Sequence, residues 1–162
     1  MSKPFDPTSH RENDAFAKGC LATFINQCRP QAKIRYLEER VETNEYGDLS
    51  MEMDDRTIYL EAEIKKAWKS GPFKYWDRGF VQFPARKLKS SYDRVDWFHM
   101  FSADGLCMLR VSREALRSSP VTEVDTNNYG PDDMVQVPLS GCEFFRREKA
   151  SAPWTDWNGV SA

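Results

Sequence analysis

The 162-residue sequence predicts one mixed α/β (α+β) domain, with a mixed central β-sheet flanked by helices. Helical periodicity is strongest near the N-terminus, whereas most of the remaining chain alternates polar and apolar residues in short stretches. Aromatic residues make up 13% of the chain, which is enough to build a sizeable core. The length suits a single globular domain and leaves no room for a second one.

The helix is predicted over Asn13–Cys28. Phe16, Cys20 and Phe24 recur at four-residue steps on one face, and Pro30 ends the pattern. Residues 1–12 are polar and are expected to be flexible, residues 13–149 to form the domain, and residues 150–162 to form a C-terminal tail.

A β-hairpin is predicted next, from strands at 46–53 and 56–66 with a tight turn at Asp54-Asp55. The second strand alternates strictly, so Ile58, Leu60, Ala62 and Ile64 should face the core, and Tyr59, Glu61, Glu63 and Lys65 the other side. Extended structure is also expected before the hairpin, at Ile34, Tyr36 and Val41.

The rest of the chain predicts short elements. A loop should span 67–79, and strands are expected at 80–83, 95–101, 106–111 and 135–137, with a turn at 102–105. Ser112 is a suitable N-cap for a short helix ending at Arg117. We expect a polar loop over 122–133 and a last helix over 142–148. Trp154 and Trp157 either dock the tail or leave it loosely attached.

Composition excludes several classes of protein. The net charge of −2 excludes histone-like binding of nucleic acid, and no apolar run approaches the ~18 residues of a membrane span. The polar N-terminus lacks the apolar core of a secretory signal, so a cytoplasmic location is expected, the host cytoplasm if the protein is viral. The four cysteines are scattered and include no CxxC pair, which favours reduced thiols over disulfides or a zinc site.

The hairpin register predicts a cluster of charged residues. A two-residue turn makes the numbers of opposed residues sum to 109, so Asp48 faces Glu61 and lies diagonally near Glu63 and Lys65, within about 7 Å. Clustered carboxylates repel one another, and a divalent cation would remove the conflict. Asp48 and Glu63 are the expected ligands of Mg²⁺ or Mn²⁺, with Lys65 placed to orient a water or stabilise phosphate charge. The alternative is that the polar residues are the solvated face of an edge strand.

Asp48, fourteen intervening residues and then Glu63-Ile64-Lys65 resemble the motif of the PD-(D/E)xK nuclease superfamily, which includes Holliday-junction resolvases and phage nucleases. The resemblance implies a restriction-endonuclease-like fold and catalytic roles for Asp48, Glu63 and Lys65. It departs from the pattern at Gly47, where the motif has Pro. The resemblance also implies a helix carboxylate in the site, and it suggests accessory residues. The candidates for the helix carboxylate are Glu12 and Asp14, in competition with Glu38, Glu39 and Glu42; the other accessory residues are Glu61 and Gln82.

The charge changes sign at this motif. Residues 37–63 hold ten acidic and two basic side chains, whereas residues 64–94 hold nine basic and two acidic ones, with aromatic residues among them. Such a stretch is typical of a surface that binds phosphates, although the bases would also serve to neutralise the acidic stretch. The expected DNA contacts are Lys66, Lys69, Lys74, Arg78, Arg86, Lys87 and Lys89. His99 lies in an apolar strand and is expected to be a buried, hydrogen-bonded residue.

The sequence therefore predicts a hydrolase, a Mg²⁺- or Mn²⁺-dependent DNA endonuclease that is structure-selective or weakly sequence-specific. Its expected setting is DNA processing, recombination or repair, in a phage or a cell, with no membrane partner. A homodimer would suit cleavage of both strands of a duplex. The alternatives are a non-catalytic nucleic-acid-binding or phage accessory protein on the same scaffold, and a small-molecule hydrolase.

Overall fold

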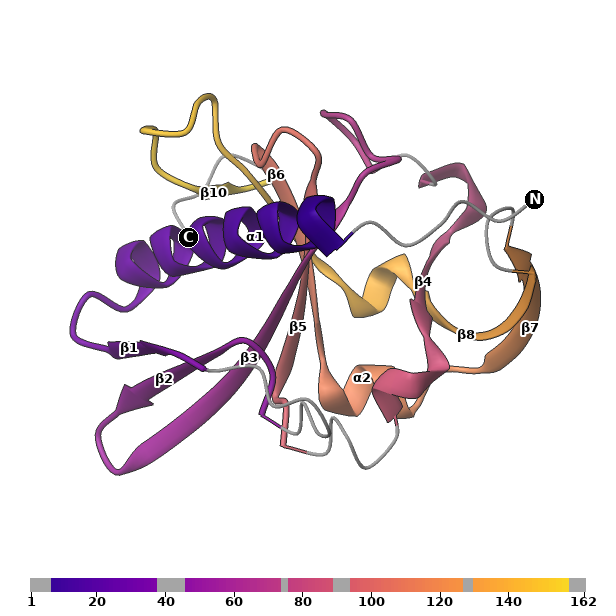
Figure 1. Ribbon diagram of the computed structural model, residues 1–162, viewed down its shortest axis with the longest axis horizontal. Coiled ribbons are helices and arrows are strands. Elements are labelled where there is room, and N and C mark those ends of the chain that lie inside the picture. The colour runs from indigo at the N-terminus through magenta and orange to yellow at the C-terminus, as the bar shows by residue number, and fades with distance from the viewer. Residues whose placement is uncertain (1–6, 38–45, 74–75, 89–93, 127–129, 158–162) are drawn as a thin grey trace.

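In the computed structural model (Figure 1), residues 7–37, 46–73, 76–88, 94–126 and 130–157 are described, and they form a mixed α/β fold around a seven-stranded sheet. The strands of this large sheet are, in spatial order, β1 (Lys33–Tyr36), β2 (Leu49–Met53), β3 (Arg56–Lys65), β5 (Trp97–Ser102), β6 (Cys107–Ser112), β9 (Glu143–Arg146) and β10 (Thr155–Asp156). Neighbouring strands are antiparallel except β3 and β5, which are parallel. The sheet is therefore mixed, as predicted.

A three-stranded antiparallel sheet and a few helices complete the described structure. The small sheet has the order β4 (Phe80–Pro84), β8 (Gly130–Pro138) and β7 (Val121–Thr126). The α-helices are α1 (Pro7–Cys28) and α2 (Arg113–Arg117), and the 3-10 helices are η1 (Trp76–Arg78), η2 (Ala85–Leu88) and η4 (Leu139–Gly141). None of the helices in these described ranges is long and apolar enough to cross a membrane.

The large sheet has a hydrophobic core on each face. On one face Leu21 and Phe24 of α1 pack with Leu60 of β3, and on the other Phe98 of β5 packs with Phe83 of β4. The prediction that helices flank the sheet is correct for the first face, whereas on the second face the short helix α2 contributes Leu116 to a core that the small sheet largely covers. The connection from β3 to β5 carries β4, so the small sheet covers the second face (Figure 1).

The hairpin has the predicted register. Met53 pairs with Arg56 and Leu49 with Leu60, so the pairs sum to 109 and the turn is Asp54-Asp55. Asp54 has a positive φ of 52°, a conformation that Asp adopts at lower cost than most residues. Leu60 and Ala62 point into the core under α1, as predicted, with Ile58 and Ile64 partly buried beside them.

Helix boundaries differ in part from the prediction. The first helix begins at Pro7 rather than Asn13, because Pro is favourable in a first helical turn and the polar residues after it present no helix breaker. The short second helix is confirmed. The Ser112 hydroxyl accepts a hydrogen bond from the Ala115 N–H at 3.1 Å, which is the expected N-cap.

Two predictions in the C-terminal half are wrong. The expected polar loop over 122–133 is largely the β7–β8 hairpin, whose polar residues lie on an exposed edge that backbone pairing stabilises. The expected helix over 142–148 contains strand β9. Its two phenylalanines obey the period of a strand, since Phe145 packs in the core under α1 and Phe144 against the other core.

The C-terminal tail is docked by Trp154. This side chain is fully buried, and Gln27 of α1 forms two hydrogen bonds with its backbone, donating to the Trp154 C=O at 2.6 Å and accepting from its N–H at 2.5 Å. The Arg147 guanidinium lies 4.6 Å from the centre of the indole ring. Trp157 is partly buried against the other core. Of the two alternatives for the tail, docking is the one observed.

Candidate functional site

The odd-numbered residues of β3 face the small sheet. Glu61 is paired with Phe98 and Glu63 with Met100, and both partners belong to the core on that side. Glu61, Glu63 and Lys65 therefore share a face, as predicted. That face is covered at Glu61, which is only 8% exposed, and β3 is not an edge strand because it lies between β2 and β5. The alternative of an exposed edge strand is thereby excluded.

Lys87 from η2 covers the two glutamates. Its Nζ lies 2.5 Å from Glu61 Oε1 and 3.6 Å from Glu63 Oε2, and the residue is 5% exposed. Lys87 was predicted to contact DNA, but it is buried between carboxylates, whose charge offsets the cost of burying an ammonium. Burial raises the pKa of Glu61, while the Lys87 charge lowers it. In the described part of the chain, the buried Glu61 Oε2 has no hydrogen-bond partner.

Asp48 lies at the start of β2 and contacts β3 through its side chain. Its Oδ2 accepts a hydrogen bond from the Ala62 N–H at 2.8 Å, while its own N–H donates to the Leu60 C=O at 2.8 Å. The carboxylate thus acts as the next acceptor of the β2–β3 ladder, near the plane of the sheet, whereas Glu63 and Lys65 project from its face. The prediction that Asp48 shares that face with them is therefore not met. Burial is the main cause that raises the pKa of Asp48 to about 7, and the charge of Glu61 adds to it.

Of the two candidate carboxylates on the first helix, Asp14 is the one whose charge acts on Asp48. The Asp14 charge contributes to the raised pKa of Asp48, and Asp14 itself forms an ion pair with Lys18 at 2.8 Å. Glu12 is exposed. The competing residues Glu38, Glu39 and Glu42 lie outside the described residues, as does Val41.

Gly47 explains the departure from the motif. Its φ is +78°, and a Cβ on it would lie 2.6 Å from the Leu60 carbonyl oxygen. Proline holds φ near −65°, so it does not fit this backbone. Glycine lets the chain pass close to β3 and deliver Asp48 to the ladder.

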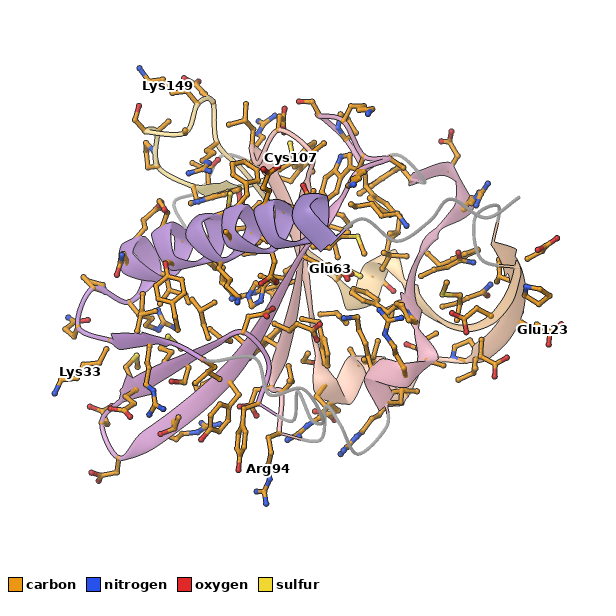
Figure 2. All side chains as sticks on the ribbon, viewed as in Figure 1. Lys33, Glu63, Arg94, Cys107, Glu123 and Lys149 are labelled. Atoms are coloured by element: carbon orange, nitrogen blue, oxygen red, sulfur yellow. The ribbon has the colours of Figure 1, made fainter. Side chains whose placement is uncertain are left out.

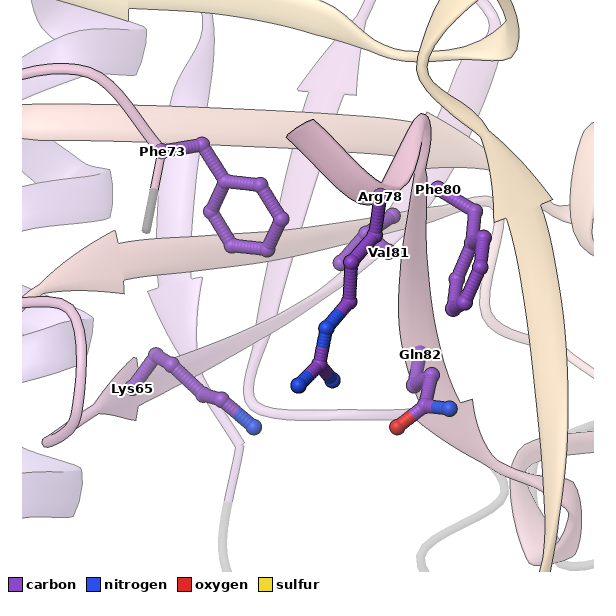
Figure 3. A pocket seen from close by; sticks show the side chains of 6 residues that line it. All are labelled: Lys65, Phe73, Arg78, Phe80, Val81 and Gln82. Carbon is purple, nitrogen blue, oxygen red and sulfur yellow. The ribbon is translucent and has the colours of Figure 1, made fainter. Parts of the chain in front are cut away.

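Lys65 lies in a small pocket with polar groups from the crossover. Figure 3 shows the ends of Lys65, Arg78 and Gln82 turned toward one another, with Val81 behind Arg78 and Phe73 above Lys65. Gln82, expected as an accessory residue, is thus a neighbour of Lys65. The pocket brings together two cations and one amide, groups that suit a phosphate oxygen.

The other predicted DNA contacts that the structure describes lie at the surface. Lys66, Lys69 and Arg86 are exposed, as Arg78 is, whereas Lys74 and Lys89 lie outside the described residues.

His99 is buried as predicted, with its Nδ1 3.1 Å from the Glu61 carbonyl oxygen. Burial and the Arg110 charge lower its pKa to about 3, so it is neutral at pH 7. The cysteines are free thiols.

Sequence reasoning named Asp14 without choosing it over the other helix candidates, and it missed the role of Lys87 as the partner of Glu61 and Glu63. The alternation of polar and apolar residues along β3 shows which side chains share a face. Nothing in that local pattern shows which later segment of the chain covers the face. For Lys87 the one available signal is its place just after the strand that ends at Pro84.

Within the described ranges, no group of three or more His, Cys, Asp or Glu side chains is arranged to hold a metal ion. Two carboxylates completed by water and substrate are enough for Mg²⁺, so this finding leaves a two-carboxylate site open. Comparison of the chain with protein-family models, curated proteins and solved structures found no match. The evidence for a function is therefore the geometry of this chain.

Proposed function

We propose that the protein is a Mg²⁺- or Mn²⁺-dependent DNA endonuclease with a restriction-endonuclease-like site of the PD-(D/E)xK type. The observation that carries the proposal is the placement of Asp48, Glu61 and Glu63 around one central strand, with Lys65 following on the same strand face. The order of elements supports it, because α1 comes first, Asp48 directly precedes β2, and β3 ends at Lys65.

The residues present fit a hard divalent cation. Asp48 is 5% exposed with a pKa near 7, and the Glu61 Oε2 atom is buried without a partner in the described structure. Lys87 compensates Glu61 and Glu63. The charge of Lys18, however, does not bring the pKa of Asp48 back to its usual range, and Mg²⁺ or Mn²⁺ would add positive charge there. Asp48 and Glu63 would hold the ion, with Glu61 beside them. When bound, the ion would polarise a phosphate and lower the pKa of a water.

The protein's own cations act on the substrate. Lys65 is placed to stabilise the negative charge that develops on a phosphate during hydrolysis. Arg78 and Gln82 line the same pocket and would orient the phosphate oxygens. Exposed Lys66 and Lys69 lie just beyond it in the chain and would contact the neighbouring backbone. With a single domain, structure-selective or weakly sequence-specific cleavage is the expected mode, as in DNA processing, recombination or repair.

A cleavage assay on branched, duplex and single-stranded DNA, with Mn²⁺ or with EDTA, tests the proposal. Lys65→Ala should retain Mn²⁺ binding by calorimetry and lower the cleavage rate about 100-fold, the usual effect of losing a charge-stabilising group. Glu63→Gln should lose both binding and cleavage. Lys33→Ala, at an exposed site on β1, is the control and should behave as wild type. Cleavage by Lys65→Ala at the wild-type rate, or no cleavage of any of the three DNAs by wild type, would contradict the proposal.

A non-catalytic nucleic-acid-binding protein on this scaffold is the second candidate. The Lys87 ammonium, which already compensates Glu61 and Glu63, favours it, because a buried ion pair can replace a metal as the partner of two carboxylates. The calorimetric measurement separates the two candidates. The non-catalytic protein should bind no Mn²⁺ at millimolar concentration. If the protein is the nuclease, the wild type should bind Mn²⁺ and the Glu63→Gln variant should not.

A further inference from the structure

An open concavity of about 500 Å³ lies near the other end of β3. Its walls are Thr57, Tyr59, Arg94, Asp96, Arg113 and Arg117, and we call it the arginine basin. Figure 2 shows Arg94 at the edge of the molecule, well apart from Glu63. The basin shares no lining residue with the pocket around Lys65.

The lining residues of the arginine basin carry excess positive charge. Three are arginines and one is an aspartate, a net of +2. The Asp96 carboxylate is engaged by the fold, since its Oδ2 accepts a hydrogen bond from the Tyr59 N–H at 2.9 Å. Its Oδ1 lies 3.6 Å from Arg113 Nη2. Guanidinium groups gathered in a concavity suit an anion with several oxygens, because each can bond two oxygens at once.

An aromatic pair borders the same concavity. Tyr59 lines it, and the Tyr46 ring lies 4.7 Å from the Tyr59 ring, with Tyr46 40% exposed. Cationic grooves combined with exposed aromatic rings are typical of surfaces that follow a polynucleotide backbone. The Thr57 hydroxyl adds a neutral hydrogen-bond donor.

We infer that the arginine basin binds a backbone phosphate of the nucleic acid whose cleavage is proposed above, on which this inference rests. Tyr59 and Lys65 lie on the same face of β3 and are six residues apart, about 20 Å along the strand. At about 3.4 Å of rise per nucleotide, that separation corresponds to roughly six nucleotides of a duplex. The basin would thus hold a phosphate about six nucleotides from the one beside Lys65, and would fix the direction of the substrate.

Salt-dependent binding of a fluorescent DNA duplex, measured by anisotropy in EDTA, tests the inference without cleavage. Arg94→Gln/Arg117→Gln should weaken binding and reduce the slope of log K against log[salt] by roughly one, because the contact with one phosphate is lost. Arg29→Gln/Lys149→Gln is the matched control. It removes the same charge at two exposed positions that do not line the basin, and Lys149 lies at the opposite edge of the molecule from Arg94 (Figure 2), so the slope should stay as in wild type.

Thermal melts with inorganic phosphate show whether the arginine basin binds a phosphate of nucleic acid or a small phosphate compound. An unchanged slope in the basin variant overturns the inference, and if inorganic phosphate then stabilises wild type but not the variant, the basin takes small phosphate compounds. Arg94→Gln alone should lower the slope in the same direction by a smaller amount, which keeps the test valid if the double variant unfolds. A reduced slope without any cleavage by wild type supports the basin and contradicts the nuclease. Cleavage with an unchanged slope contradicts the basin alone.

Discussion

The carboxyl group of Asp48 has a structural and a chemical role that oppose each other. It completes the β2–β3 ladder as an acceptor for the Ala62 N–H, which favours a carboxylate, yet it is almost fully buried, which favours the protonated acid. Burial prevails and raises its pKa from the usual 3.8 to about 7. A residue held near its titration point at neutral pH is one that a bound cation would readily ionise.

Asp48→Asn should change how stability depends on pH. The folded wild type keeps a proton that the unfolded chain releases between about pH 4 and 7, so stability falls as pH rises through that window. The asparagine oxygen still accepts from Ala62 but carries no charge. We expect the variant to gain stability relative to wild type as pH rises, by at most about 4 kcal/mol at pH 8.

Urea unfolding in EDTA at pH 5, 6.5 and 8 measures this difference. Glu52→Gln, at an exposed position on the same strand, is the control and should show the pH dependence of wild type. A difference between Asp48→Asn and wild type that stays constant across the three pH values would show that Asp48 is ionised in the folded protein throughout.

At the scale of elements, the β2–β3 hairpin is the part of the fold that local sequence determines most strongly. Strict alternation defines the two faces of β3, and the two-residue turn defines the register, so the neighbours of Glu61 follow from the chain alone. Lys87 does not follow, because η2 reaches Glu61 through a connection that also builds a strand of a second sheet. The polar sequence of β7 hides a strand, since its stability comes from pairing with β8 rather than from burial.

Gly47→Ala tests whether this element depends on close approach of the chain. A methyl group there would meet the Leu60 carbonyl oxygen at 2.6 Å on a backbone with φ of +78°, so both a clash and strain are expected. We expect a loss of more than ~2 kcal/mol in the free energy of unfolding. Gly71→Ala is the matched control. Its φ is +70° with nothing within 4 Å of the added atom, so it should cost only ~1 kcal/mol. Equal losses would remove the clash from the explanation.

Over the whole molecule, the large sheet separates two cores that different parts of the chain close. The crossover between β3 and β5 closes the face that carries Glu61, while α1 closes the opposite face together with Trp154 of the tail. Because α1 also carries Asp14, the docking of the tail stabilises the helix that presents a charge to Asp48. The sequence left the tail undecided, since two indoles among small polar residues suit a loose segment as well as a docked one.

Trp154→Ala should destabilise the protein by about 3–5 kcal/mol, because a fully buried indole leaves a cavity that the core under α1 cannot easily fill. Trp157→Ala, at a partly buried site, should cost less. Trp154→Phe should lower the free energy of unfolding less than Trp154→Ala does. The buried Trp154 Nε1 has no hydrogen-bond partner in the part of the chain described, so replacing the indole by a phenyl ring breaks no hydrogen bond. Urea unfolding gives these values, and hydrogen exchange should show that α1 loses protection in Trp154→Ala alone. Equal effects of the two alanine substitutions on α1 would mean that the tail does not hold the helix.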